Sequence, residues 1–471
     1  MKLKLCIVLL VFIWFDMHPA DKKASGWPEK NRIELSQGPQ PNILIIIADD
    51  CTYSDLAIYE GRNVNTPNID LLASESLVFN KAYLSMAMCA PSRAEFFTGK
   101  YPQNNGLAYN HGKAKNNVKS IVQYLGQLGY RTGIAGKIHV KPDSVFPFEK
   151  VEGLERSSVS KTVKYDSAGM EEFIARDNSP FCLVAGLVVP HAPWTVGDAS
   201  HFNKEQLILP PYMADTPETR ENYSRYLAEI EVLDDQVGMT LEMLEKSGKA
   251  DNTIVVFTTE QGSKFPFNKW TNYDMGVHTG FIVRWPGKTP VGKRTDALIQ
   301  YADVLPTLLD AAGGRPNVND FDGSSFLEVI KDNETKHRKF AYGMHNNIPE
   351  GPPYPVRSIT DGNWHYIKNI ESESIYVIKH LMGTTRTSDY WSSWLYESTS
   401  NEHTLKLVNR YIKRPIEELY YTSEDPFEQN NLAENSSYQE LKLKLSQELE
   451  NWTEKNGNST DSWDAYNETI K

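Results

Sequence analysis

The sequence predicts an α/β protein with a mostly parallel sheet between helices and a smaller α+β region towards the C-terminus. Four short apolar runs lack the alternation of a one-sided strand, which is typical of parallel strands buried on both faces. They cover residues 42–48, 131–135, 181–189 and 253–258. Helical patterns lie between these runs, and strands that alternate with helices favour a layered α/β domain.

The helical segments carry apolar residues at helical spacing. This spacing predicts helices over 117–128, with Gly129 as the stop, over 216–246, and over 297–312 with an interruption at Pro306. Another helix is expected near 437–455. We expect a large domain over residues 36–350 and a C-terminal subdomain over 351–471, which mixes short strands with that helix and packs against the large domain.

The composition is that of a soluble globular protein. Of the 471 residues, 40% are hydrophobic and 23% are charged. The formal net charge of −12 argues against a nucleic-acid partner, which would require a basic excess. An anionic substrate remains compatible with this charge, because basic residues can gather locally in an acidic protein.

The first residues resemble a signal peptide. Lys2 and Lys4 precede an apolar run, residues 5–15, that is too short for a comfortable membrane span. We expect residues 1–24 to be the signal, the mature protein to be periplasmic or secreted, and no stable membrane span to remain after cleavage. An N-terminal membrane anchor is the alternative.

Ionisable or amide side chains follow each of the four apolar runs. In chain order they are Asp49 and Asp50, then Lys137 and His139, then His191, and finally Glu260 and Gln261. Each has an ordinary explanation when taken singly, such as a helix cap or a turn residue. Because open α/β sheets bind ligands beyond the carboxyl ends of their strands, their convergence predicts one shared site.

The chemistry of these side chains suits a hard divalent cation beside an anionic group. The oxygen donors of Asp49, Asp50, Glu260 and Gln261 favour calcium, with magnesium second, over zinc. Lys137, His139, His191 and Lys269 would supply positive charge and proton transfer. This combination suits displacement at an anionic tetrahedral centre.

A longer motif allows a resemblance to be named. Cys89-Ala-Pro-Ser-Arg93, continuing to Phe97-Thr-Gly-Lys100, resembles the signature of the type I sulfatases, and the similarity extends from Pro41 to about Asn431. Within that family, Gly136-Lys-Ile-His-Val140 and Lys269-Trp-Thr-Asn272 look closest to the heparan N-sulfatase (sulfamidase) branch. The resemblance implies an alkaline-phosphatase-like large domain.

The resemblance also implies a chemistry. Cys89 would be converted to formylglycine (3-oxoalanine) by a formylglycine-generating or an anaerobic sulfatase-maturating enzyme, and its hydrate would attack sulfur. The metal ligands would be Asp49, Asp50, residue 89, Glu260 and Gln261. Arg93 and Lys137 would neutralise developing charge, Lys269 would hold a sulfate oxygen, His191 would protonate the leaving group, and His139 would act as the base that releases sulfate.

Two positions depart from the family pattern. Glu260 and Gln261 stand where the family usually has Asp followed by Asn or His, so each side chain is one methylene longer. Lys269 stands where the sulfamidase branch has Arg, and a lysine binds a sulfate oxygen as a point charge without a guanidinium fork. The metal position or its affinity is therefore expected to differ from the family's.

The substrate is expected to be a sulfated, uronate-containing polysaccharide or its oligosaccharides, of the ulvan or glycosaminoglycan type. His111, His345 and Arg357 are candidates for the sugar-binding rim, and Arg357 could pair with a uronate. The sequence leaves O-sulfate and N-sulfate open. Two alternatives remain: a phosphomonoester or phosphonate hydrolase of the same superfamily, and a sulfated-glycan binding protein with impaired catalysis.

Overall fold

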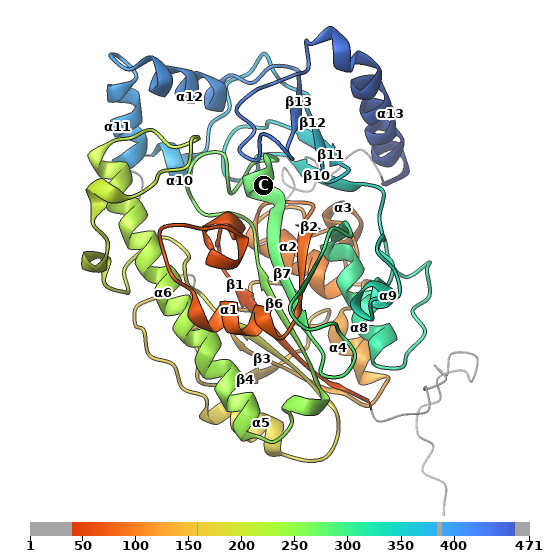
Figure 1. Ribbon diagram of the computed structural model, residues 1–471. Helices are drawn as coiled ribbons and strands as arrows, with labels where there is room; N and C mark the ends of the chain where they lie inside the picture. The colour runs from red at the N-terminus through yellow and green to blue at the C-terminus, as the bar shows by residue number, and fades with distance from the viewer. Residues whose placement is uncertain (1–39, 158, 384–388, 457–471) are drawn as a thin grey trace, which may run out of the picture.

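The computed structural model describes residues 40–157, 159–383 and 389–456. The expected signal peptide at 1–24 lies outside the described residues. Within those ranges the strands form two sheets, one of nine strands and one of four (Figure 1). The large sheet has the order β4-β3-β5-β1-β6-β7-β2-β8, with β9 beside β2.

The large sheet is mostly parallel, as predicted. Its central strand β1 (Asn42–Ala48) pairs in parallel with β5 (Phe181–Gly186) and β6 (Thr253–Thr259). The exception is β7 (His278–Arg284), which is antiparallel to both of its neighbours. The other strands are β2 (Leu77–Tyr83), β3 (Arg131–Gly136), β4 (Glu149–Val151), β8 (Lys293–Thr295) and β9 (Ile299–Gln300).

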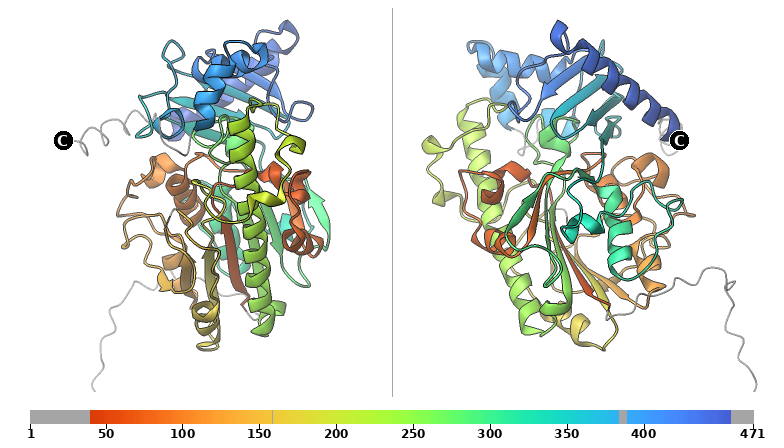
Figure 2. Two further views of the ribbon diagram at one scale, coloured as in Figure 1. Left: turned by 90° about the vertical axis from the view of Figure 1, so that its left-hand side faces the viewer. Right: turned by 45° about the vertical axis from the view of Figure 1, so that its right-hand side comes forward.

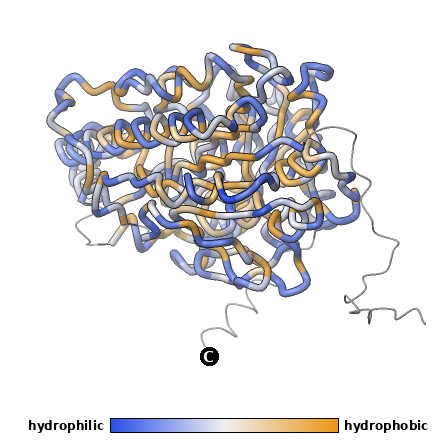
Figure 3. The backbone as a smooth tube through the Cα atoms, turned by 90° about the horizontal axis from the view of Figure 1, so that it is seen from below, coloured by the Kyte–Doolittle hydropathy of each residue, from blue (hydrophilic) through white to orange (hydrophobic). Residues whose placement is uncertain are grey.

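Both faces of this sheet are covered. Along β1, Ile43, Ile45 and Ile47 enter one apolar cluster while the alternate residues enter another, so the strand has no polar face. The helices α1 (Pro67–Ser74), α5 (Ala168–Ala175) and α6 (Pro217–Lys246) contribute to one cluster, and α2 (Cys89–Thr98), α4 (Ile121–Gly126) and α8 (Val304–Ala311) to the other. Figures 2 and 3 show the resulting layers, with hydrophobic segments in the interior. Each buried isoleucine contributes about 1.5–3 kcal/mol, which explains why these runs show no alternation.

The predicted helices are present with adjusted ends. α6 begins at Pro217, and the Thr216 hydroxyl caps it by accepting from the Thr219 N–H at 3.1 Å. α4 covers only the middle of the predicted 117–128 helix, because Ser120 and Gln123 form a capping box that starts the helix at Ile121. The C-terminal helix α13 (Gln439–Asn456) lies close to its predicted range.

Two sequence predictions about element ends are wrong. The third apolar run reaches Val189, but β5 ends at Gly186, and the rest of the run enters the buried loop that carries His191. The segment 297–312 is not one helix, since β9 and a 3-10 turn precede α8. Pro306 lies in the first turn of α8, where its missing N–H costs no hydrogen bond.

The smaller sheet is antiparallel throughout and lies at one end of the large sheet (Figure 1). Its strands are β10 (Ala341–His345), β11 (Val356–Thr360), β12 (Trp364–Asn369) and β13 (Glu417–Tyr421). The helices α10 (Lys379–Met382), α11 (Asp389–Glu397) and α12 (Glu402–Ile412) follow β12, and α9 (Leu327–Ile330) precedes β10. The small sheet therefore starts at Ala341, inside the range expected for the large domain. No helix in the described ranges is long and apolar enough to cross a membrane.

Buried hydrogen bonds connect the small sheet to the half of the molecule that contains the large sheet. The Met344 N–H of β10 donates to the Ser85 carbonyl at 2.7 Å, just before α2. The Asp274 N–H donates to Glu428 Oε2 at 2.8 Å, and the other oxygen of Glu428 lies 2.5 Å from His365 Nδ1 on β12. The position of the small sheet is thus fixed by polar contacts as well as by apolar packing.

A buried carboxyl group holds the loop that follows β5. Glu229, in the middle of α6, accepts the N–H groups of Thr195 and Val196 at 2.7 and 3.2 Å through Oε1. Burial raises the pKa of Glu229 to about 8, although the two N–H groups lower it. The side chain therefore fixes the path of the loop between His191 and α6.

We expect this group to make stability fall with rising pH. Because the pKa of Glu229 is higher in the folded chain than in the unfolded one, its contribution is complete below about pH 4.5 and is lost as the pH rises through about 8. The thermal midpoint of the wild type should therefore fall more steeply between pH 5 and 8 than that of Glu229→Gln. Glu218→Gln, an exposed change on the same helix, should keep the wild-type slope; equal slopes for all three proteins would contradict this assignment.

Candidate active site

The carboxyl ends of four neighbouring strands meet at the start of α2. β1 leads into Asp49 and Asp50, β3 into Lys137 and His139, β5 into the loop with His191, and β6 into Glu260 and Gln261. Cys89 is the first residue of α2 and is 1% exposed. The structure therefore brings together the residues that the sequence placed in one site.

Each carboxylate at this edge has its own buried cation. Lys137 pairs with Asp49, Lys269 pairs with Asp50 at 2.6 Å, and Arg93 pairs with Glu260. Burial by itself would raise the pKa of Asp49, but the neighbouring cations, Lys137 first, hold it well below its usual range. Burial likewise lowers the pKa of Lys269, yet Asp50 and Cys89 outweigh it and raise the value. The site is thus a dense alternation of opposite charges without access to bulk water.

The thiol of Cys89 lies in the middle of these charges. Its Sγ is 3.1 Å from Lys269 Nζ, 3.2 Å from Gln261 Nε2 and 3.5 Å from Asp50 Oδ1. Burial, followed by the charge of Asp50, raises the pKa of this thiol well above its usual value. Reactive cysteines have lowered pKa values, so the unmodified thiol is a poor nucleophile in this setting.

Residues of α2 and its neighbourhood orient the site from behind. The Ser92 hydroxyl donates to the Cys89 carbonyl at 3.0 Å and to Gln261 Oε1 at 3.2 Å. Arg93 also donates to the Lys137 carbonyl at 2.6 Å, which joins α2 to the end of β3. The N–H of Ala90 donates to Asn110 Oδ1 at 3.2 Å. These contacts fix residue 89 relative to two strand ends.

Three histidines lie beside this cluster. His191 Nε2 is 3.3 Å from Asp50 Oδ2 and 3.4 Å from Lys269 Nζ, and burial lowers the pKa of His191 to about 4. Neither ring nitrogen of His139 has a hydrogen-bond partner within the described ranges. Burial, with Lys137, lowers the pKa of His139 far below its usual value, so this imidazole is neutral. The His111 ring lies 5.2 Å from the His139 ring between centroids.

The backbone at this edge adopts a conformation that most residues avoid. Asp50, His111, His139 and Trp270 all have positive φ values, from 52° to 67°. Such conformations cost roughly 1–3 kcal/mol each and persist where the surrounding structure holds them. The concentration of these backbone conformations around Cys89 is typical of a functional site, and no sequence motif predicts them.

Four of these side chains could hold a metal ion. Ligand atoms of Asp49, Asp50, Cys89 and His191 all lie within 4.8 Å of one another. Asp49 Oδ1 is buried and has no hydrogen-bond partner in the described part of the chain, as expected of an oxygen that faces a cation. Gln261 turns its Nε2 towards Asp50, and Glu260 is engaged by Arg93, so these two predicted ligands border the group rather than complete it.

The predicted rim residues are dispersed. His111 is exposed beside His139, whereas His345 is fully buried on β10. Arg357 is 4% exposed and donates to the carbonyl of Val356 and to Asn346 Oδ1 at 2.8 and 3.0 Å. A role in substrate binding for these three residues stays a prediction.

Other residues near Cys89 escaped the sequence reasoning. Asn110 links Ala90 to Glu350, and Trp270 lies between Lys269 and His380. None of them belongs to a run that ends at the catalytic edge, and the positive φ values appear only in three dimensions. Ser92 and Trp270 each lay inside a quoted motif, Cys89–Arg93 and Lys269–Asn272, and these motifs were the available signals.

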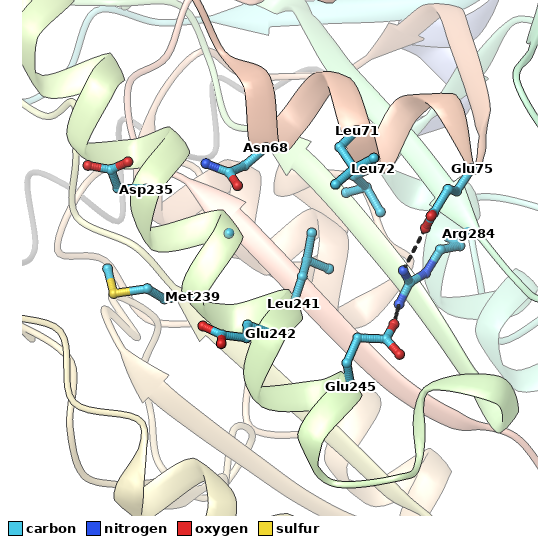
Figure 4. A pocket seen from close by; sticks show the side chains of 11 residues that line it. Asn68, Leu71, Leu72, Glu75, Asp235, Met239, Leu241, Glu242, Glu245 and Arg284 are labelled. Carbon is cyan, nitrogen blue, oxygen red and sulfur yellow. Dashed lines mark hydrogen bonds and ion pairs between the residues drawn. The ribbon is translucent and has the colours of Figure 1, made fainter.

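A separate pocket of about 680 Å³ lies between α1 and α6, away from the catalytic edge (Figure 4). At its far end Arg284 bridges Glu75 and Glu245 at 3.0 and 3.2 Å. Arg284 is the last residue of β7, which runs antiparallel to β6, so this pocket lies at the amino end of the parallel strands. It contains none of the residues that surround Cys89.

Comparison with known proteins agrees with this geometry. A family model described as Sulfatase matches residues 41–314, and one described as N-sulphoglucosamine sulphohydrolase, C-terminal, matches residues 262–381. An ulvan-active sulfatase of Formosa agariphila is 30% identical over 426 residues, which is 89% of this chain and 81% of the relative. The human N-sulphoglucosamine sulphohydrolase is 26% identical, over 87% of this chain and 89% of its own. The chain belongs to the type I sulfatase family and is a sulfuric ester hydrolase.

Solved structures support the fold. A protein in complex with its substrate D-glucosamine-2-N,6-O-disulfate aligns with a TM-score of 0.66 at 20% identity, over 90% of this chain and 99% of its own. The phosphonate monoester hydrolase of Agrobacterium radiobacter aligns with a TM-score of 0.68 at 16% identity, over 89% of this chain and 96% of its own. At these identities the likeness concerns the fold, and it confirms the alkaline-phosphatase-like architecture.

The buried ion pairs predict a large difference between two lysines. Lys137→Met would leave Asp49 buried without its cation, which costs about 3–5 kcal/mol and should lower the thermal midpoint by at least about 5 °C. Lys150→Met is the matched control, since Lys150 is largely exposed and 3.9 Å from Asp143, and exposed pairs contribute little. Differential scanning fluorimetry measures both, and equal midpoints would contradict the proposed charge balance.

Proposed function

We propose that this protein is an exported sulfatase that removes sulfate from a uronate-containing polysaccharide or its oligosaccharides, with formylglycine at position 89 and calcium as the metal. The observation that carries the proposal is the placement of Cys89. This residue begins α2, 3.1 Å from Lys269 and 3.5 Å from Asp50, inside the motif Cys89-Ala-Pro-Ser-Arg93. Family membership and the fully buried ion pairs around it support the same reading.

The side chains divide the work of sulfate-ester hydrolysis between them. Lys269 Nζ lies beside residue 89, where it binds an oxygen of the entering sulfate, and Arg93 and Lys137 offset the negative charge that develops there. His191 lies next to Lys269, where an anionic group favours its protonated form and so lets it deliver a proton to the leaving oxygen or nitrogen. His139, neutral and without a hydrogen-bond partner in the described ranges, accepts the proton that is lost when sulfate departs.

Formylglycine would supply a hydrated aldehyde as the nucleophile, in place of a thiol that this environment keeps protonated. Calcium, when bound, would lower the pKa of that nucleophile and offset charge on the sulfate oxygens. Asp49 and Asp50 would hold the ion through carboxylate oxygens, with residue 89 beside them. Rotation of the Gln261 amide would turn Oε1 towards the same group, and Glu260 borders it.

The names of the relatives support the substrate class. One is called an ulvan-active sulfatase and another an N-sulphoglucosamine sulphohydrolase, and each aligns along most of its length. We therefore propose a sulfated carbohydrate with uronate residues, exported activity in the periplasm or outside the cell, and a maturation enzyme as partner. A sulfur centre bonded to oxygen or to nitrogen fits the same arrangement of Lys269 and His191.

The proposal is tested by the state of residue 89 and by product release. The chain should be co-expressed with a formylglycine-generating enzyme, and peptide mass spectrometry across residue 89 should show the loss of mass expected for the aldehyde. Sulfate release from ulvan and heparan sulfate oligosaccharides should follow the modified fraction and fall at least about 100-fold in Cys89→Ala. Activity in an unmodified chain would overturn the mechanism, and faster turnover of phosphate or phosphonate esters than of sulfate esters would overturn the reaction class.

Calcium binding should be visible without an activity assay. A ligand that binds only the folded protein raises the thermal midpoint, so calcium should stabilise the metal-free wild type more than magnesium does. Asp50→Asn should lose most of this gain, because it removes a carboxylate charge from the site. Asp143→Asn, an exposed change, should retain it. A midpoint that calcium leaves unchanged in the wild type would contradict the assignment.

A further inference from the structure

Two chains of contacts lead from Cys89 to the same short helix, α10, outside the catalytic set. The first runs through hydrogen bonds. The Ala90 N–H donates to Asn110 Oδ1 at 3.2 Å, and Asn110 Nδ2 donates to Glu350 Oε1 at 3.1 Å. The Glu350 carbonyl then accepts the Lys379 N–H at 2.8 Å.

The second chain runs through an aromatic side chain. Lys269 Nζ, which is in contact with Cys89, lies 5.1 Å from the centroid of the Trp270 ring. The same ring stacks on His380, with 6.0 Å between centroids and 24° between planes. Both chains end on adjacent residues, so α10 is connected to the surroundings of residue 89 by two separate routes.

The surroundings of these two residues are basic although the protein is acidic. Lys379 and His380 are exposed. Lys379 Nζ donates a hydrogen bond to the Pro349 carbonyl. Burial first, and then the neighbouring Lys379, Lys264, Lys269 and His111, together lower the pKa of His380 to about 4, so its imidazole is neutral near pH 7. The carboxyl groups nearby are Glu350, whose pKa burial raises, and Asp389, near Lys264.

We propose that Lys379 and His380 form a subsite for a second anionic group of the substrate, either a uronate carboxylate or a further sulfate. The proposal rests on the sulfatase function above and adds a determinant of its substrate. Glu350 acts as a positioning residue, because its side chain holds Asn110 and its carbonyl holds the N–H of Lys379.

This subsite explains how an acidic protein could select a polyanion. The catalytic cations are already paired with Asp49, Asp50 and Glu260, so an anion outside the reacting sulfate needs other partners. Arg357 was the sequence candidate for a uronate, but it is buried and donates to the Val356 carbonyl and to Asn346 Oδ1. Lys379 offers exposed positive charge on α10, and the exposed His380 ring offers an N–H donor next to it, whereas Arg357 is buried.

The test compares substrates that differ only in the second anion. The kcat/KM of the wild type, Lys379→Ala, Lys379→Arg and His380→Ala should be measured on p-nitrophenyl sulfate, which has a single anionic group. The same proteins should be assayed on an ulvan or heparan sulfate oligosaccharide and on its carboxyl-reduced form, and on glucosamine 2-N-sulfate against glucosamine 2-N,6-O-disulfate. Lys288→Ala is the matched control, since Lys288 is exposed in the turn after β7, at the opposite edge.

We expect KM for the intact oligosaccharide or for the disulfate to rise about fivefold in each alanine variant, with kcat unchanged and Lys379→Arg close to wild type. Turnover of p-nitrophenyl sulfate should stay within about twofold. Loss of the effect on carboxyl reduction identifies the carboxylate, and loss on removal of the 6-sulfate identifies the sulfate; either supports the subsite. Equal effects on all substrates, or none, overturn it. A wild type that hydrolyses no sulfate ester overturns the proposed function instead.

Discussion

Three buried carboxylates at one edge of a sheet, each neutralised by a different buried cation, form the constraint on which the catalytic half of this molecule depends. Asp49, Asp50 and Glu260 lie at the ends of two adjacent strands, where their like charges would repel in a low dielectric. Lys137, Lys269 and Arg93 reach them from β3, from the loop after β6 and from α2. The elements that surround Cys89 are therefore held together by charge as well as by packing.

The same constraint explains why the backbone is strained here. Asp50 lies two residues after β1 and His139 lies three residues after β3, and both have positive φ. Strain of this kind persists only where other contacts hold it, and the ion pairs supply them. Charge balance, local strain and the position of residue 89 thus depend on one another.

The small sheet takes part in this arrangement and is more than a cover. Met344 on β10 binds Ser85 just ahead of α2, and Glu350 reaches Ala90 through Asn110. In the proposed mechanism, residues from the large sheet bind and displace sulfate. The small sheet and α10 contribute the side chains that would recognise the rest of the sugar. In this proposal the large sheet carries out the reaction, while the small sheet and α10 select the substrate. The two parts meet at α2.

Much of the catalytic half followed from sequence because its signals are local. The four predicted strands are apolar runs buried on both faces, and the ionisable residues that follow them lie at the same edge. The segment 297–312 was read wrongly because its apolar residues serve a strand, a turn and a helix in succession, and periodicity averages over all three. β7 went unpredicted, since its antiparallel direction is decided by its partners and not by its composition.

The sequence by itself determined the α/β class, the proposed reacting residue Cys89 and the set of charged residues around it. These follow from short-range pattern and from a contiguous motif. Only the tertiary structure decided which cation pairs with which carboxylate, that Arg357 is buried, and that His380 stacks on Trp270. The reason is physical: the ion pairs join residues that are from 88 to 219 positions apart, and no local property of a chain encodes a distance through space.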